Sequence, residues 1–194
     1  MSTLAIYGDA GEQVIDEGHR PAAGPPQMAG VATAWEHAGE GARADRVIIL
    51  RTGIVLDRNT PALDRLTTLT RFGLGGRISG GDQWISWIHI DDFLRALDFV
   101  RDEPSIAGVV HVTSPKPIRN RDMMTNLRRR LHRPWSPPTP KPLVHLGARL
   151  MWTDPALALT GRRCVPKRLL DSGFVFAHPE FDEALTELVG RPGA

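Results

Sequence analysis

The sequence of residues 46–56 is RVIILRTGIVL. Four successive apolar residues, Val47 to Leu50, run without polar alternation, and charged residues and Gly53 bound them. A strand with one face in water alternates polar and apolar residues, whereas a continuous apolar run is typical of a strand covered on both faces. This stretch therefore predicts a buried strand of a parallel sheet.

Strand and helix patterns alternate on both sides of this stretch. Further apolar runs predict strands at residues 2–7, 85–90, 109–114 and 174–176. Apolar residues at helical spacing predict helices at residues 27–41, 60–72, 93–100, 120–131, 143–150, 166–171 and 181–189. The alternation predicts an α/β fold with a parallel sheet. We expect one unit over residues 1–115 and a smaller helical subdomain over residues 116–194.

The composition argues against several classes of protein. Hydrophobic residues make up 41% of the 194 residues and charged residues 24%, which is typical of a globular protein. The one cysteine, Cys164, supports no disulfide framework and no cysteine-based zinc site, and we expect it to be a small buried side chain. The net charge is only +2, and the one dense basic run, Arg128 to Arg130, falls at a predicted helix end, so we expect no nucleic-acid partner. No secretory signal and no run near the ~20 apolar residues of a membrane span is present, so we expect a cytoplasmic protein without a membrane partner.

A glycine-rich loop, GLGGRISGGDQW, occupies residues 73–84. Its backbone N–H groups could approach a phosphate. Ile78 stands where the third glycine of GxGxxG belongs, and the loop follows a helix instead of a strand, so we reject it as a dinucleotide phosphate loop. Two alternatives stay open, a flexible loop over a substrate cleft and a plain connector. In the first, Arg77 and Gln83 would meet an anionic group.

His89 lies two residues before Asp91 in the motif HIDD. This spacing could supply metal ligands or a histidine that a carboxylate orients. The structural interpretation is better, because Asp91 or Asp92 would cap the following helix and stabilise its positive end. In the same way, Thr60 would cap the helix that begins at Pro61. We assign no metal to the chain.

Three aromatic residues are candidates for a site. Tyr7 could be a general acid if a lysine lowered its pKa, but the first lysine in the chain is Lys116, and a packed aromatic is the commoner role. Trp84 and Trp87 could stack on a sugar or a base. Strand alternation places these two on opposite faces, so at most one faces a cleft.

Several blocks of the sequence resemble one known family, the atypical extended short-chain dehydrogenases/reductases often labelled nucleoside-diphosphate-sugar epimerases. These blocks are AIYGDAGEQVIDE (5–17), AWEHA (34–38), RTGIVL (51–56), GLGGRISGGDQWISWIHIDD (73–92), TSPKPIRNRD (113–122) and CVPKRLLDSGFVFAHPEFDEAL (164–185). The last block resembles the C-terminal domain peculiar to that family. The resemblance implies a partial Rossmann-type parallel sheet with a small helical subdomain on the substrate side.

In that family's order, residues 2–7 would be the fifth strand and residues 46–51 the sixth. The first four strands, the glycine-rich turn and the acidic ribose-binding residue would then fall outside these residues, which at ≥30 residues per βαβ unit is about 100 residues. We therefore expect no tight NADP or NAD binding by this chain alone. An uncovered sheet edge would favour a homo-oligomer or a separate chain that supplies the missing strands.

The resemblance also implies site residues. Family members use a Ser/Thr after the fifth strand and a Tyr-x-x-x-Lys on the next helix. Ser2 or Thr3 matches the first position and Tyr7 follows on the same strand, but the helix pair aligns with Met28 and Ala32, which cannot donate a proton or hold a ribose. Residues expected to line the cleft are Thr52, Gly53 and Ile54 for the cofactor, and Arg77, Gln83, Trp84 and His89 for the substrate.

Two functions follow from this resemblance. One is an NAD(P)-dependent sugar-nucleotide epimerase or reductase-like protein, inactive or incomplete as written, that acts on a nucleotide-sugar or another small molecule. The alternative is a non-catalytic binding module or remnant that retains the substrate-side half.

Overall fold

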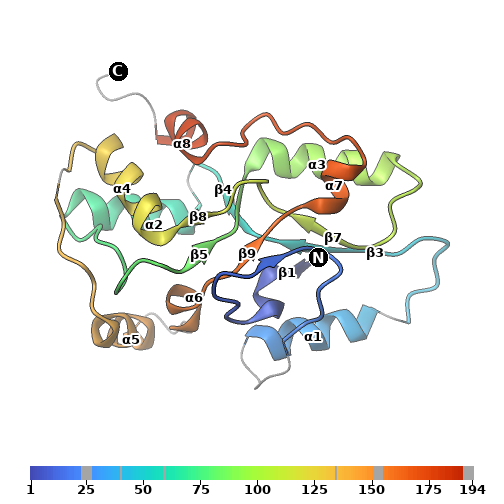
Figure 1. Cartoon of the computed structure of the whole chain (residues 1–194), viewed down its shortest axis with the longest axis horizontal. Helices are drawn as coiled ribbons and strands as arrows, with labels where there is room; N and C mark the ends of the chain where they lie inside the picture. Colours follow the sequence, from blue (N-terminus) through green and yellow to red (C-terminus); the bar gives the residue numbers. More distant parts are fainter. Residues whose placement is uncertain (23–27, 40, 59, 134, 151–154, 190–194) are drawn as a thin grey trace.

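A three-stranded parallel sheet of order β1–β3–β7 forms the centre of the computed structural model, which describes residues 1–22, 28–39, 41–58, 60–133, 135–150 and 155–189 (Figure 1). Its strands are β1 (Ser2–Thr3), β3 (Ile48–Thr52) and β7 (Gly108–Val112). The α/β class and the parallel sheet are confirmed. The full burial predicted for the β3 stretch is wrong for residues 48–50, which are only partly buried.

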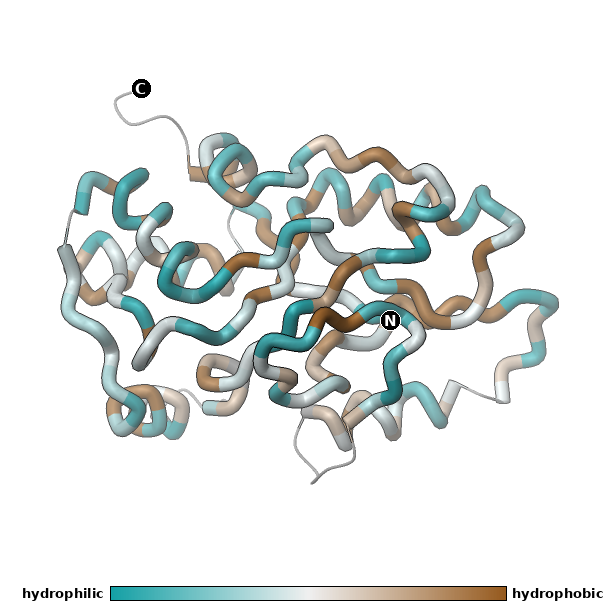
Figure 2. The backbone as a smooth tube through the Cα atoms, viewed as in Figure 1, coloured by the Kyte–Doolittle hydropathy of each residue, from teal (hydrophilic) through white to brown (hydrophobic). Residues whose placement is uncertain are grey.

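Helices cover the two faces of this sheet. Figure 1 shows α1 (Met28–Gly39) on one side, with α3 (Ile90–Asp102) and α7 (Lys167–Asp171) on the other. The α3 side contains a cluster of buried apolar side chains, which comprises Ile88, Phe93, Ala96, Val100, Ile106, Val110, Val112, Leu169 and Phe174. Figure 2 shows apolar segments concentrated along these central strands. The α1 side has a smaller cluster that includes Ile6, Ala32 and Cys164, and the expected burial of Cys164 is confirmed.

Short strand pairs extend the core away from the sheet. Strand β4 (Ile54–Leu56) pairs in parallel with β6 (Trp87–His89), and β2 (Val14–Ile15) pairs in parallel with β9 (Arg163–Cys164). The pair β5 (Trp84–Ile85) and β8 (Ile118–Arg119) is antiparallel. These pairs bring the C-terminal part of the chain against the N-terminal part.

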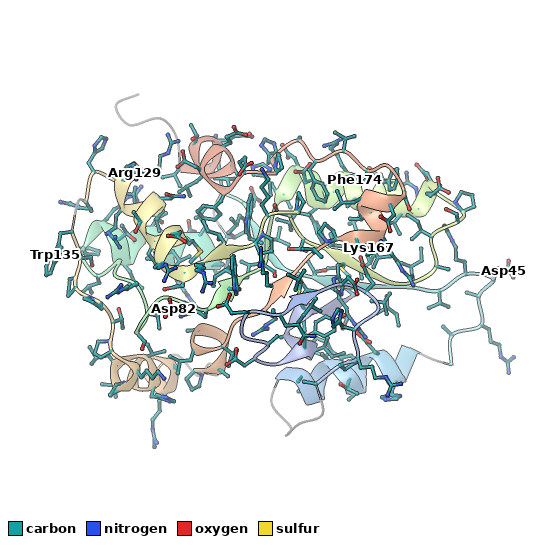
Figure 3. All side chains as sticks on the ribbon, viewed as in Figure 1. Asp45, Asp82, Arg129, Trp135, Lys167 and Phe174 are labelled. Carbon is teal, nitrogen blue, oxygen red and sulfur yellow. The ribbon has the colours of Figure 1, made fainter. Side chains whose placement is uncertain are left out.

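A third apolar cluster joins α2 (Pro61–Arg71), α4 (Asn120–Arg130) and α8 (Phe181–Val189) around Trp87. The cluster draws residues from both sides of position 115, so the division at 115 stays a prediction. Two more helices, α5 (Lys141–Leu150) and α6 (Ala156–Leu159), lie beside the glycine-rich loop (Figure 1). The basic run ends α4 as predicted: Arg129 is exposed (Figure 3) and Arg130 forms an ion pair of 3.0 Å with Asp182. Among the described residues, none of the helices has the length and apolar character that crossing a bilayer requires.

Two predicted strands are wrong. Residues 2–7 stop being a strand at Thr3, whose Oγ1 accepts a hydrogen bond from Ala5 N at 3.2 Å and starts a 3-10 helix, η1 (Leu4–Tyr7). The apolar run is buried all the same. Residues 174–176 form no ladder, and Phe174 instead packs edge-on against Phe99 and Phe176.

One predicted helix cap is wrong, and a second is confirmed in position but makes no capping hydrogen bond. At α3 the capping residue is His89, whose Nδ1 accepts a hydrogen bond from Asp91 N at 3.2 Å. Asp92 instead accepts from the backbone N–H groups of Ala177 and His178. Thr60 lies at the cap position of α2, but its hydroxyl donates to Asp57 O at 2.8 Å and caps nothing.

Candidate ligand pocket at the strand ends

A pocket of about 270 Å³ opens where β1 and β3 end. It is lined by Thr3, Leu4, Ala5, Thr52, Gly53, Ile54, Ala62, Trp84, Ile85, Ser86, Thr160 and Arg162. Ligands of open α/β sheets bind at the carboxyl ends of the strands, which is the place of this pocket. Of the residues predicted from the sequence, Thr3, Thr52, Gly53, Ile54 and Trp84 are brought together here.

The register of the sheet explains why some strand residues reach the pocket and others do not. Ser2, Arg51 and His111 lie opposite one another across the three strands, and the next row is Thr3, Thr52 and Val112. Successive side chains of a strand point to opposite faces. The first row therefore enters the α1 side of the sheet, and the threonines of the second row reach the pocket.

Gly53 permits the close approach of strands at the pocket floor. Its N–H donates to Val112 O at 3.0 Å, and the N–H of Ile54 donates to Ser86 O at 2.9 Å. A Cβ at position 53 would lie 2.8 Å from Ser86 O and 3.0 Å from Thr113 Oγ1. No larger residue fits there without a backbone shift, so this glycine has a clear packing role.

Two polar groups of the lining have unusual environments. The buried hydroxyl Thr52 Oγ1 has no hydrogen-bond partner among the described residues. Arg162 donates through Nη2 to Thr160 Oγ1 at 2.8 Å and has no described carboxylate within ion-pair distance; burial lowers its pKa, and the more distant Asp9 opposes this shift. A buried polar atom without a partner and a cation without a close counter-ion both cost free energy. An anionic ligand would supply the close counter-ion that Arg162 lacks, and Thr52 would have to rotate its buried hydroxyl to reach the ligand.

Arg162 is held in place by the pocket's other edge. Its backbone N–H donates to Trp84 O at 3.0 Å, and its carbonyl accepts from Ser86 Oγ at 2.9 Å. Arg162, Ser86 and Thr160 were not predicted from the sequence. No pattern in the sequence could have indicated Arg162, because it lies 110 positions from Thr52 and joins the pocket through tertiary hydrogen bonds to Trp84 and Ser86.

Trp84 faces the pocket side but is already engaged by cations. The guanidinium groups of Arg119 and Arg163 each lie 4.5 Å from its ring centroid, and its Nε1 donates to Glu12 Oε2 at 3.1 Å. A sugar or base that stacked on this ring would have to displace one of them, so its predicted stacking role stays a prediction. Trp87 is fully buried in the core, as expected for the other member of the pair.

Tyr7 lies in a buried polar network on the α1 side. Its hydroxyl is 2.6 Å from His111 Nε2 and accepts from Arg51 Nη1 at 2.6 Å. His111 Nδ1 is 3.0 Å from Val165 O, a pure acceptor, so Nδ1 carries the ring proton and Nε2 accepts from Tyr7. Burial raises the pKa of Tyr7 to about 12 and lowers that of His111 to about 4.

The same network ends at Glu36 of α1. Arg51 donates to both of its carboxylate oxygens at 2.9 and 2.7 Å, and Ser2 Oγ donates to it at 2.6 Å. Burial raises the pKa of Glu36, but these hydrogen bonds outweigh it and leave the pKa lowered. Ser2 and Tyr7, both predicted catalytic, are thus tied to structural partners, and neither lines the pocket.

The remaining predicted residues lie elsewhere. Gln83 lines a second pocket of about 250 Å³ along the glycine-rich loop and donates to Ala158 O at 3.0 Å. Arg77 is exposed and lines neither pocket. A Cβ on Gly76 would meet Pro137 O at 1.7 Å, so this part of the loop is packed as a connector would be. His89 is buried at the start of α3.

Comparison with known proteins shows what the chain is similar to. Residues 139–188 match a domain of unknown function, DUF1731. The chain is 35% identical to an epimerase family protein of Mycobacterium bovis over 99% of this chain and 63% of that protein. It is 31% identical to the chloroplastic epimerase family protein SDR39U1 homolog of Arabidopsis thaliana, over 97% of this chain and 53% of that one. The chain thus spans less than two thirds of the length of these relatives.

Solved structures agree with this placement. The crystal structure of human epimerase family protein SDR39U1 (isoform 2) with NADPH matches with a TM-score of 0.86 and 26% identity, over 96% of this chain and 63% of that one. A nucleoside-diphosphate sugar epimerase from Corynebacterium glutamicum matches with a TM-score of 0.76 and 27% identity, over 97% of this chain and 36% of that one. Over nearly its whole length the chain is therefore similar to epimerase family proteins of the atypical short-chain dehydrogenase/reductase type.

Proposed function

We propose that this chain forms the substrate-side part of an NAD(P)-dependent epimerase or reductase, and that the pocket at the ends of β1 and β3 binds a phosphate-bearing nucleotide. The observation that carries the proposal is Arg162, a partly buried cation that lines the pocket and has no described carboxylate within ion-pair distance. Arginine forks are well suited to bind phosphate oxygens. Relatives support the ligand class, since the human family protein was solved with NADPH.

The described residues offer polar groups for one end of a nicotinamide dinucleotide but no motif for its pyrophosphate. Thr52 Oγ1 offers an unused hydroxyl, and Arg162 offers charge beside it. None of the strand-to-helix turns in the described part carries GxGxxG, the motif that holds a pyrophosphate. When bound, the dinucleotide would supply hydride transfer. Thr52 and Arg162 would orient the part of the dinucleotide that enters this pocket, or the substrate. The apolar lining from Leu4, Ala5 and Ile54 would exclude water.

The experiment is a calorimetric titration of the purified protein with NADPH and, separately, with UDP-glucose. For whichever nucleotide the wild type binds, we expect Arg162→Gln to raise the dissociation constant by about 10- to 100-fold, the contribution of a charge-assisted hydrogen bond. Arg77→Gln is the matched control, because Arg77 is exposed and lines neither pocket. Equal losses in both variants, or no binding of either nucleotide, would reject the pocket as the site.

A second candidate function is a binding module without turnover. It is favoured by the position of Tyr7, whose hydroxyl is committed to His111 and Arg51, and by the pocket lining, which includes no lysine. A protein that binds nucleotide but consumes no NADPH with any carbonyl or nucleotide-sugar substrate offered would support this candidate. Measurable turnover would reject it.

The free side of β1 bears on assembly. Among the described residues β1 pairs only with β3, so a second copy or a separate strand-supplying chain could extend the sheet there. Both partners stay proposals. Light scattering after size-exclusion chromatography tests them, and a monomer at all concentrations would argue against a homo-oligomer.

A further inference from the structure

A cluster of two histidines and two carboxylates lies around the end of β6 and the start of α3, outside the lining of the pocket. It consists of His89, Asp91, His178 and Glu187, and one ligand atom of each lies within 4.8 Å of those of the other three. His178 Nε2 lies 3.8 Å from Asp91 Oδ2 and 3.5 Å from Glu187 Oε2. His89 Nδ1 lies 3.8 Å from the same Asp91 oxygen. None of these residues lines the nucleotide pocket.

The cluster is assembled from three separate parts of the chain. His89 ends β6 and is 1% exposed, Asp91 is in the first turn of α3, and Glu187 is in the last turns of α8. Figure 1 shows the start of α3 beside α8. The two imidazole rings lie 4.0 Å apart between centroids, with planes tilted by 34°.

Asp92 fixes the backbone on which His178 stands. Its two carboxylate oxygens accept from the N–H groups of Ala177 and His178, each at 2.8 Å, and its side chain is fully buried. Arg95 pairs with Asp92 at 2.9 Å and balances its charge. This arrangement holds both histidines on rigid backbone, while Asp91 and Glu187 are half-exposed and free to adjust.

The charges of the cluster call for a cation. Two carboxylates face the same His178 nitrogen, and the imidazole of His89 lies against that of His178, so several potential ligand atoms converge on one point. A neutral imidazole and a carboxylate are the ligands that zinc and related divalent ions take, at about 2.0–2.2 Å from the metal. A tetrahedral site of that size has its ligand atoms about 3.4 Å apart, so the four ligand atoms, now within 4.8 Å of one another, would have to close by at most about 1.4 Å.

We propose that His89, His178, Asp91 and Glu187 form a binding site for a divalent transition-metal ion of the zinc type. His89 would ligate through Nδ1, and the metal would replace the 3.2 Å hydrogen bond from Asp91 N that this nitrogen accepts as the cap of α3. The ion would join the end of β6, the start of α3 and α8. Its role is structural, because no step of the proposed nucleotide chemistry reaches it.

The test is a titration of EDTA-treated protein with Zn²⁺, followed by calorimetry, and with Co²⁺, followed by the visible absorption that reports tetrahedral coordination. We expect one ion per chain. Glu187→Gln should weaken binding on the order of 100-fold, since even outer-shell changes cost 10- to 100-fold. The matched control is Glu183→Gln, which makes the same change one turn earlier on the exposed surface of α8 and should leave binding unchanged.

Two further variants keep the result interpretable. His178→Ala should abolish the Co²⁺ spectrum, with circular dichroism to verify folding, and His145→Ala on the exposed side of α5 should not. No zinc binding at micromolar concentration would overturn the proposal. Equal effects of Glu187→Gln and Glu183→Gln would overturn it as well. None of these readouts depends on nucleotide binding or turnover.

Discussion

The network around Tyr7 and the pocket at the strand ends are built on neighbouring residues of the same strands, yet their polar groups are satisfied differently. Ser2, Arg51 and His111 form one cross-strand row, and each finds partners within the protein. One residue further along, Thr52 has a buried hydroxyl with no described partner and lines the same pocket as Arg162, which has no described carboxylate within ion-pair distance. Polar side chains whose hydrogen bonds are all satisfied within the protein therefore indicate a structural role, whereas unsatisfied polar side chains in an apolar pocket indicate a ligand site.

The largest expected effect is on the network. Arg51→Leu would leave the Glu36 carboxylate and the Tyr7 hydroxyl without their main donor, and Arg51 is only 4% exposed. Breaking a buried ion pair costs about 3–5 kcal/mol of unfolding free energy, which urea denaturation measures. Arg101→Leu, which removes an exposed ion pair on α3, should leave the midpoint nearly unchanged. A loss below about 1 kcal/mol for Arg51→Leu would contradict the structural role of the network.

The next effect is a pH dependence from His111. Burial lowers its folded-state pKa to about 4, below the unfolded value of 6.5, so the unfolded state binds the extra proton between these values. The stabilisation is therefore fully present above pH 6.5 and is lost as the pH falls toward 4, by about 3 kcal/mol in total. Unfolding curves of the wild type and His111→Gln should converge as the pH falls through this window. Curves that stay parallel would show that His111 is not buried neutral.

A smaller effect concerns the shape of the pocket floor. Gly53→Ala would place a Cβ 2.8 Å from Ser86 O, and the backbone shift should cost about 1–3 kcal/mol. Gly147→Ala in α5 meets nothing within 4 Å and should instead stabilise the helix by about 0.5–1 kcal/mol. Thermal unfolding of both variants tests the difference. A neutral Gly53→Ala would mean that the strand ends are looser than the structure shows.

The smallest expected effects are on the stability of two single-hydroxyl variants, one in the Tyr7 network and one in the pocket. Tyr7→Phe strands His111 Nε2 without its donor and should cost about 1–2 kcal/mol. Thr52→Val removes a hydroxyl that bonds to nothing described, so stability without ligand should change by less than about 0.5 kcal/mol. Chemical denaturation of the two variants side by side provides the measurement. A larger loss for Thr52→Val than for Tyr7→Phe would reverse the assignment of roles.

The sequence predicted the elements whose pattern and burial agree. The helix at Phe181–Val189 was predicted at its observed bounds, because its apolar residues recur at helical spacing and all contribute to the core. The apolar run of residues 2–7 was misassigned because a buried 3-10 turn and a buried strand both need only apolar residues. The hydrogen bond from Ala5 N to Thr3 Oγ1 decides between them.

The candidate site was predicted about by half. Thr3, Thr52, Gly53 and Ile54 follow strands in the sequence, so their place at the sheet edge could be inferred. Arg162 could not be inferred, because tertiary pairing alone brings it there. The histidine cluster was missed for the same reason: the motif HIDD supplies His89 and Asp91, but His178 and Glu187 arrive from the C-terminal part.

Ligand-induced thermal shifts test whether the unsatisfied polar side chains of the pocket bind ligand and whether the paired side chains around Tyr7 stabilise the fold. The melting temperature would be measured with and without saturating NADPH or UDP-glucose for the wild type, Arg162→Gln and Tyr7→Phe. A ligand that binds only the folded state raises the melting temperature. We predict that Tyr7→Phe melts lower than the wild type but keeps the ligand shift, and that Arg162→Gln melts near the wild type but loses the shift. The opposite pattern would contradict the account.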